Sequence, residues 1–262
     1  MDEIIHVGPW GIAGAASLIL ANAAASFWLR LGLEKKILIG AIRAVIQLLL
    51  LGYVLVPVFR LKSPWLVGAI GVVMVLVAAR EAIRRSERAY KGAWGDMFVT
   101  LLIAASITSW FGTAVLVGVD PWWTPRYFIP LLGMLLGNAL NGITIGIDST
   151  LRELDEGRSR IEGRLALGAT WWEASRHAVA EAVRLAMMPT LNMMTVVGIV
   201  SIPGMMTGQI LGGTPPEIAA RYQIIILFMI AATVAVGTVT ASVITVRRLF
   251  DDEHRLRVER II

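Results

Sequence analysis

Residues 222–246 read YQIIILFMIAATVAVGTVTASVITV and contain neither a charged residue nor a proline. A helix needs about 20 mostly apolar residues to cross the ~30 Å hydrocarbon layer of a bilayer, so this stretch predicts a transmembrane helix. Of the 262 residues in the chain, 56% are hydrophobic and only 16% are charged, and the mean hydropathy is +0.71. Apolar runs of similar length recur along the chain. We therefore expect an all-α polytopic membrane protein with a single transmembrane domain over residues 1–262.

The apolar runs predict seven spans, whose orientation follows from the charges between them. The spans lie at about 8–29, 37–58, 64–83, 97–118, 127–147, 185–212 and 222–246. The successive connections carry 3, 2, 5, 1, 6 and 1 Lys or Arg residues, and the C-terminal tail carries 5. Because cytoplasmic loops hold the excess of Lys and Arg, we expect the N-terminus outside and the C-terminus in the cytoplasm.

Charge and cysteine content exclude some classes of protein. The net charge of +5 follows from the basic loops, so it does not indicate a nucleic-acid partner. The chain has no cysteine, and hence no disulfide and no thiolate metal site. Its N-terminus, MDEIIHV, is acidic, whereas a signal peptide begins with basic residues. The first span is therefore expected to remain as a helix in the bilayer.

The longest connection, residues 148–184, carries helix-capping patterns. Ser159 with Glu162, and Thr170 with Glu173, both fit the capping box, in which a hydroxyl and a carboxylate satisfy N–H groups at a helix start. Gly168 lies between them, where a helix end favours a positive φ. We predict a short helix at about 160–167, a turn, and a second helix that enters the sixth span. This hairpin either rests on lipid headgroups or docks a soluble partner.

Several motifs together resemble a known family of permeases. The stretch EGRLALGA, from Glu162, is similar to the cytoplasmic signature of ABC-transporter permeases, although Gly163 and Arg164 replace its two alanines. The wider pattern consists of RAVIQLLLLGYVL (43–55), PLLGMLLGNALNG (130–142), RIEGRLALGAT (160–170) and PTLNMMTVVGIVSIPGMMTGQILGGTPPEIAARYQI (189–224). Together these motifs resemble the FetB-type permeases of bacterial iron-export ABC transporters, which have plant relatives in aluminium tolerance.

The resemblance implies a function and partners for the chain. It implies a homodimeric permease in a bacterial inner membrane that exports iron or a related metal species. The chain itself would bind no cofactor, because two copies of a separate ABC ATPase would hold the ATP and Mg. The resemblance also implies an ATPase-coupling surface on the loop, formed by Ser159, Glu162, Leu165, Gly168, Thr170 and Glu173.

Polar residues inside the predicted spans are candidates for a translocation path. Arg43 lies about 10 Å into the second span, with Gln47 one turn further on the same face. A charge at this depth is costly, so Arg43 either snorkels to the interface or faces a cavity or a dimer interface. In the fifth span, Asn138 lies in a small-residue stripe with Gly142 and Gly146, and Asn141 lies in another with Gly133 and Gly137. Both stripes suit close helix packing or a substrate path. Asn192 in the sixth span has the same two interpretations.

The sixth predicted span is interrupted within the membrane. Pro203 removes a backbone donor and Gly204 permits almost any backbone conformation, so a helix break is expected here. Such a break is either a simple kink or part of a transport site, because transporters use broken helices to make sites at depth. The candidates for lining it are Met205, Met206, Thr207 and Gln209.

The spans lack the usual ligands of a hard metal ion. Iron prefers carboxylate and imidazole, whereas thioether selects Cu(I), and methionine also fills apolar gaps without any metal role. No Asp, Glu or His lies well inside a span, and the metal ligands are therefore unknown. We expect low-affinity passage or a chelated form of the metal.

Three classes of function compete. The chain has no P-loop motif, so ATP hydrolysis would fall to a partner. The leading hypothesis is the permease subunit of an ABC exporter. The alternative is an ion-coupled secondary transporter of a metal or small solute, which would need an intramembrane acid or histidine relay. A membrane-embedded enzyme would need a cluster of acid, base or metal ligands near one interface.

Overall fold

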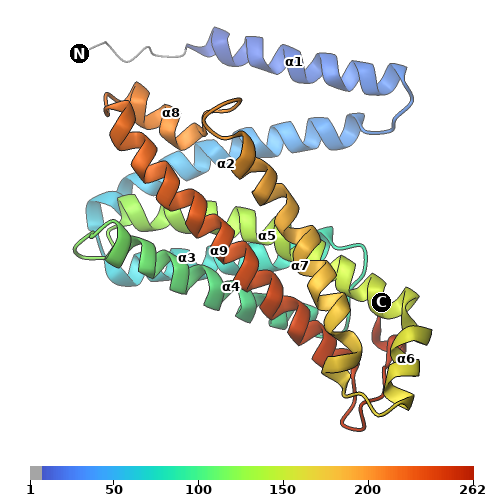
Figure 1. The fold of residues 1–262 in the computed structure, drawn as a ribbon. Helices are drawn as coiled ribbons and strands as arrows, with labels where there is room; N and C mark the ends of the chain where they lie inside the picture. Colours follow the sequence, from blue (N-terminus) through green and yellow to red (C-terminus); the bar gives the residue numbers. More distant parts are fainter. Residues whose placement is uncertain (1–7) are drawn as a thin grey trace. The chain divides into compact units, whose positions relative to one another are not determined.

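A computed structural model describes residues 8–262, and over this range the chain is helical with no β-strand. The acidic N-terminal segment, including His6, lies outside the described residues. The helices are α1 Pro9–Trp28, α2 Glu34–Leu61, α3 Pro64–Arg85, α4 Ala93–Trp110, the π-helix η1 Phe111–Leu116, α5 Pro125–Glu156, α6 Arg158–Ala166, α7 Trp171–Val196, α8 Gly204–Leu211, α9 Pro216–Leu249 and the 3-10 turn η2 Val258–Arg260 (Figure 1).

Local sequence explains where most of these helices begin and end. Pro64, Pro125 and Pro216 each occupy the first turn of a helix, where the missing N–H costs nothing and the fixed φ suits the helix. Three predicted spans, 37–58, 127–147 and 222–246, lengthen at both ends, because polar and charged residues continue the helices beyond the apolar core. The clearest case is α5, which runs on to Glu156 although its predicted span ends at 147.

The structure confirms an all-α polytopic membrane protein. Among the described residues, six helices are long and apolar enough to cross a membrane: Trp10–Trp28, Glu34–Leu61, Pro64–Arg85, Ala93–Leu116, Pro125–Glu156 and Pro216–Leu249. The predicted span at 185–212 is divided between α7 and α8. A count of seven spans and the N-outside orientation therefore stay predictions.

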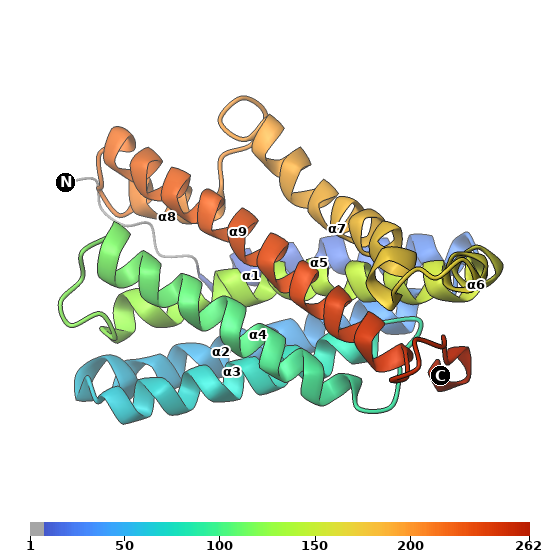
Figure 2. The same cartoon turned by 60° about the horizontal axis from the view of Figure 1, so that its bottom comes forward.

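The chain forms two compact units. The first contains α1 and α2, which pack against each other, together with residues 211–213. The second contains residues 63–210 and 214–262. In the second unit α5 is the central helix, because it packs against α3, α4, α7 and α9. Helices α8 and the start of α9 lie at one end of this unit, and α6 and the C-terminus lie at the opposite end (Figures 1 and 2). We call these the α8 end and the α6 end.

Glycines let α5 and α9 approach closely. A Cβ placed on Gly142 would lie 2.6 Å from Cγ1 of Val234, and one placed on Gly146 would lie 2.5 Å from Cγ2 of Thr238. From the other side, a Cβ on Gly237 would lie 2.9 Å from Cδ1 of Ile143. The predicted small-residue stripe thus packs against α9 at two of its positions, as expected for helices that associate in a membrane.

A matched pair of alanine variants tests this contact. Gly146→Ala should lower the thermal stability of the purified protein, because the new methyl group overpacks the α5–α9 contact, at a cost of about 1–3 kcal/mol. Gly137→Ala is the control, since nothing lies within 4 Å of a Cβ added there. Alanine is the better helix former, so the control should be as stable as the parent or more stable. Equal melting temperatures for the two variants would contradict the close contact.

Candidate functional site

The turn between α6 and α7 has the geometry expected from its capping residues. Gly168 has φ +89°, its N–H donates to the carbonyl of Leu165 (2.9 Å), and the N–H of Ala169 donates to that of Arg164 (3.1 Å). This is the Schellman pattern of a helix end. The capping box at the start of α7 is complete, because the N–H of Glu173 donates to Oγ1 of Thr170 (3.3 Å) and the N–H of Thr170 donates to Oε2 of Glu173 (2.8 Å).

The predicted capping box at Ser159 and Glu162 is wrong. Helix α5 ends at Glu156 and α6 begins at Arg158, so only Gly157 lies between them. Gly157 is the N-cap of α6, and no side chain makes a capping bond there. Such a short connection leaves Ser159 inside the first turn, where its hydroxyl cannot serve as the N-cap. Glu162 instead accepts a hydrogen bond from Nε of Arg158 at 2.7 Å.

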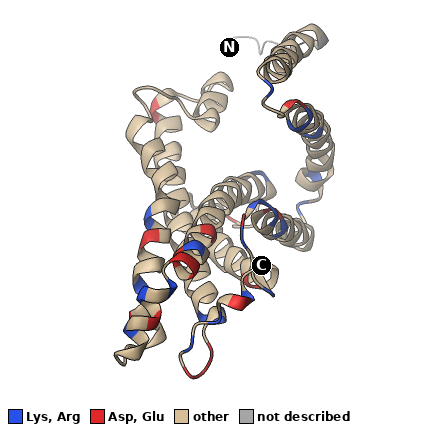
Figure 3. Ribbon diagram, turned by 90° about the vertical axis from the view of Figure 1, so that its right-hand side faces the viewer, with Lys and Arg blue, Asp and Glu red and all other residues tan. Residues whose placement is uncertain are grey.

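One face of helix α6 is buried, whereas the turn at its C-terminal end is exposed. Ile161 is only 2% exposed, and Leu165 is half-buried. Leu167, at the turn, is 89% exposed. Exposed polar or charged residues dominate the rest of the helix, and Figure 3 shows such residues gathered around α6 and the C-terminus. The α6–α7 turn thus presents the exposed side chain of Leu167 on a capped support, and its role in docking stays a prediction.

The C-terminal tail, residues 250–262, folds back on the α6 end. The Asp251 carboxylate accepts hydrogen bonds from the N–H groups of Arg255 (2.8 Å) and Glu253 (3.0 Å). The bond from the Arg255 N–H is the largest cause of the lowered pKa of Asp251, with the Arg257 guanidinium adding to it. At the end of the tail, the N–H of Ile262 donates to the carbonyl of Ala89 (2.8 Å).

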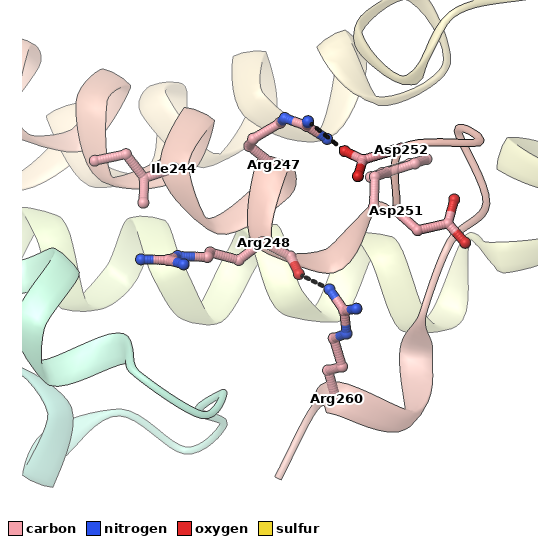
Figure 4. Close-up of a pocket in the computed structure, with 7 residues that line it drawn as sticks. Ile244, Arg247, Arg248, Asp251, Asp252 and Arg260 are labelled. Atoms are coloured by element: carbon pink, nitrogen blue, oxygen red, sulfur yellow. Dashed lines mark hydrogen bonds and ion pairs between the residues drawn. The ribbon is translucent and has the colours of Figure 1, made fainter.

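Further bonds fasten the tail to the end of α9 (Figure 4). Arg260 donates to the carbonyl of Arg248 at 2.6 Å, and Arg247 pairs with Asp252 at 3.1 Å. A hollow of about 640 Å³ lies between α6 and the tail, lined by Glu162 and Leu165 on one side and by residues 253–257 on the other. The sequence analysis missed this contribution of the tail, whose only signal was its five basic residues.

Two carboxylates, each next to the end of a predicted span, connect the helices at the α6 end. The Asp96 carboxylate on α4 accepts hydrogen bonds from Nε (2.9 Å) and Nη2 (2.8 Å) of Arg248 on α9. It also accepts a hydrogen bond from the hydroxyl of Tyr90 (3.0 Å). Tyr90 is buried, and burial raises the pKa of its hydroxyl well above the usual value. Asp148 on α5 accepts the N–H of Glu87 at 2.9 Å. These bonds hold the loop after α3 against α5 and α9.

The predicted break in the sixth span is present, and it begins before Pro203. Helix α7 ends at Val196, and α8 begins at Gly204. The carbonyl of Val196 accepts the N–H groups of Val200 (2.9 Å) and Ser201 (3.3 Å), while Gly198, at φ +81°, donates its N–H to the carbonyl of Ser201 (2.9 Å). The turn therefore satisfies much of its own backbone, as irregular chain placed within a membrane would have to.

A pocket of about 570 Å³ lies beside α8. Its walls come from η1, α8 and the first turns of α5 and α9, all from the second unit. Apolar side chains form much of the lining, and Leu131, Ile226 and Met229 among them belong to the buried core. The polar side chains of the lining are those of Thr113, Arg126, Tyr127, Gln209, Thr214 and Tyr222.

Gln209 is the polar residue that faces the pocket from the broken helix. Its Oε1 atom is buried and has no hydrogen-bond partner among the described residues. Arg126, from the first turn of α5, makes no ion pair with another described residue. At the back of the pocket, η1 leaves α-helical geometry, and a Cβ on its Gly112 would lie 2.0 Å from Cε of Met229. π-Helical segments often accompany functional sites.

The structure brings together only some of the candidate path residues. Met205 and Gln209 line the pocket, whereas Met206 and Thr207 do not, and Thr207 bonds to the carbonyl of Pro203 on the exposed side (3.2 Å). Asn138 donates to the carbonyl of Met134 in its own helix (2.8 Å). Their roles in transport, like the roles of the coupling residues, stay predictions.

The other candidates lie away from the pocket lining. Asn141 accepts a hydrogen bond from Arg85 at 3.2 Å, Asn192 is exposed on α7, and Arg43 and Gln47 belong to α2 in the first unit. The sequence analysis missed Arg126, Tyr127 and Tyr222 as pocket residues. The signal available for Arg126 was its position as the single basic residue of its loop, which we had used only for topology.

No metal centre is formed by the part of the chain that the structure describes. Residues 8–262 contain no group of three or more His, Asp or Glu side chains placed to hold an ion. Among the described residues, those that line the pocket include no His, Asp or Glu. The three methionines near it, Met134, Met205 and Met229, pack against the core.

The fold and these sites define a class of multi-pass membrane protein with a broken helix at one end and a capped turn that exposes a leucine at the other. The chain belongs to the uncharacterised protein family UPF0014, whose profile matches residues 9–250. It is 34% identical to a UPF0014 membrane protein of Synechocystis, over 95% of this chain and 93% of that one. No solved structure matches the chain.

Two further relatives have informative names. The chain is 32% identical to the probable iron export permease protein FetB of Escherichia coli, over 95% of each chain. It is 31% identical to the protein ALUMINUM SENSITIVE 3 of Arabidopsis thaliana, over 94% of this chain and 88% of that one. These matches confirm the resemblance drawn from the motifs and the multi-pass membrane location. A bacterial inner membrane is consistent with them.

The two capping patterns allow a direct comparison. Thr170→Ala should cost about 1 kcal/mol at the start of α7, because it leaves helix N–H groups without a partner. Amide hydrogen exchange in the first turn of α7 should then be several-fold faster. Ser159→Ala is the matched control, since Ser159 makes no capping bond in α6. Similar changes in both variants would contradict the assignment of the caps.

The same cap should weaken in acid. The Thr170 backbone N–H, and then its hydroxyl, lower the pKa of Glu173 below its ordinary value. A carboxylate with a lowered pKa stabilises the helix start fully above its unfolded value of about 4.3, and this stabilisation is lost as pH falls through the lower, folded value. Exchange in the first turn of α7, corrected for its intrinsic rate, should stay constant above about pH 5 and rise below about pH 4. Glu173→Gln should abolish this dependence.

Proposed function

We propose that the chain is the membrane-spanning permease subunit of an ABC transporter that exports iron or a related metal species. The observation that carries the proposal is the α6–α7 turn, a rigid and capped element with the exposed Leu167 at its tip. An element of this kind suits insertion into a cleft of a soluble ATPase. The name of the Escherichia coli relative, a probable iron export permease, supports the direction and the substrate.

In this proposal, energy enters at the α6 end and acts at the α8 end. Helix α7 begins at the docking turn and ends at the break, 26 residues later, which spans about 39 Å. It packs against α5 and α9, and its buried residues run from Ala174 to Thr190. Closure of an ATPase dimer on residues 159–173 would move α7 as a lever, and the turn at 197–203 would serve as its joint.

The remaining parts of the transporter would come from other chains. Two ATPase subunits would bind ATP and Mg, while two copies of this chain in a bacterial inner membrane would form the path between them. In this scheme the chain has no catalytic residue of its own. The alternative, an ion-coupled secondary transporter, lacks support from the pocket, whose lining contains no Asp, Glu or His.

Co-purification with a partner ATPase tests the proposal. Leu167→Asp should remove the apolar knob and reduce ATPase binding at least tenfold, because burying a carboxylate in the partner's cleft is costly. Gly168→Trp should act similarly, since a side chain is strained at φ +89°. Ile262→Asp, at an exposed apolar residue of the tail, is the control.

Each variant should first be shown to be folded by its melting temperature in detergent. ATPase binding and coupled turnover that are unchanged in both Leu167→Asp and Gly168→Trp would contradict the docking role. Transport by the purified chain in vesicles without any ATPase would favour the ion-coupled alternative.

A further inference from the structure

The pocket at the α8 end has a charge that does not suit a bare metal cation. Among the described residues, its one charged side chain is the exposed guanidinium of Arg126, which has no ion-pair partner there. Arginine stays protonated at any physiological pH, and an uncompensated guanidinium repels a divalent cation and attracts an anion. The electrostatics of the lining therefore select for negative charge.

The remaining polar groups also suit an organic ligand better than an ion. Carboxylate and imidazole, which hard metal ions prefer, are absent from the lining, and its thioethers of Met134, Met205 and Met229 pack against buried apolar residues. The Oε1 atom of Gln209 is buried and lacks a donor among the described residues. A buried acceptor without a donor is unfavourable, and a rotation of the Gln209 amide toward the pocket would let a ligand hydroxyl satisfy it.

From this combination we infer that the pocket binds an anionic, hydroxyl-bearing ligand, such as a metal enclosed in a hydroxycarboxylate chelate. Arg126 binds a carboxylate of the ligand, for which its planar fork of donors is well shaped. Gln209 accepts a hydrogen bond from the ligand hydroxyl, and the apolar wall covers the rest of the ligand. The pocket volume of about 570 Å³ lies within the range of small-molecule sites. The transport of such a ligand rests on the proposed function, whereas its binding does not.

Binding to the purified full-length chain, without any ATPase, tests the inference. The probes are ferric citrate, citrate, tricarballylate, which is citrate without its hydroxyl, and free ferrous ion under reducing conditions. Wild-type protein should bind ferric citrate and citrate saturably and should bind free ferrous ion far more weakly. It should prefer citrate over tricarballylate by about fivefold.

Variants assign the binding to the two residues. Arg126→Gln should weaken binding of ferric citrate at least tenfold. Arg221→Gln is the matched control, because Arg221 is an exposed arginine beside the pocket residue Tyr222 and does not line the pocket. Gln209→Met keeps the size of the side chain and removes the acceptor, so it should abolish the preference for citrate over tricarballylate.

Three results would overturn the inference. One is wild-type affinity for ferric citrate in Arg126→Gln. The second is saturable binding of free ferrous ion that competes with the chelate and falls in Met205→Leu. The third is complete displacement of the chelate by phosphatidylglycerol in nanodiscs, which would show that a lipid headgroup occupies the site. Any of these can occur while the ATPase still docks on the α6–α7 turn, so failure here is distinct from failure of the proposed function.

Discussion

The close approach of α5 and α9 is the contact on which the second unit depends. Gly142 and Gly146 on α5 and Gly237 on α9 let side chains of the opposite helix fill the space that a Cβ would take. In a membrane the hydrophobic effect does not drive helices together, so close van der Waals packing of this kind is a main source of their association. Residues in the first turns of α5 line the pocket. After the last turn of α5, the single residue Gly157 leads into helix α6.

Hydrogen bonds and ion pairs of charged side chains connect the elements at the α6 end, whereas the α8 end contains irregular backbone and polar groups without partners among the described residues. Asp96 and Asp148 bind Arg248 and the loop after α3, and the tail folds over the same end. At the α8 end the chain leaves regular helix twice, at η1 and at residues 197–203. Around the pocket, Gln209 and Arg126 keep polar groups without partners among the described residues. Helix α7 joins these two ends, because it begins at the α6–α7 turn and ends at the break.

How far local patterns predict this structure depends on what each pattern measures. Thr170 and Glu173 predict a cap correctly, because every partner of that motif lies within three residues. Ser159 and Glu162 match the same motif and form no cap, because α5 continues to Glu156 and leaves only Gly157 before α6. A capping motif says nothing of where the preceding helix ends. Likewise Pro203 and Gly204 locate the break, while its start at Val197 follows from a turn that closes on the Val196 carbonyl.

The sequence by itself determined the all-α membrane class, most helix ends, the capped turn before α7, the break and the family. Each of these depends on composition or on residues close together in the chain, where apolar length, missing N–H groups and local caps set the outcome. Only the tertiary structure decided which polar residues share a site. Arg126 and Gln209 lie far apart in sequence and meet at one pocket because α5 and α8 both pack near the start of α9. Asn141 lies on the same helix as Arg126, but its side chain is hydrogen-bonded to Arg85 and does not line the pocket. Which neighbour a polar side chain finds depends on helix packing, and no local pattern records it.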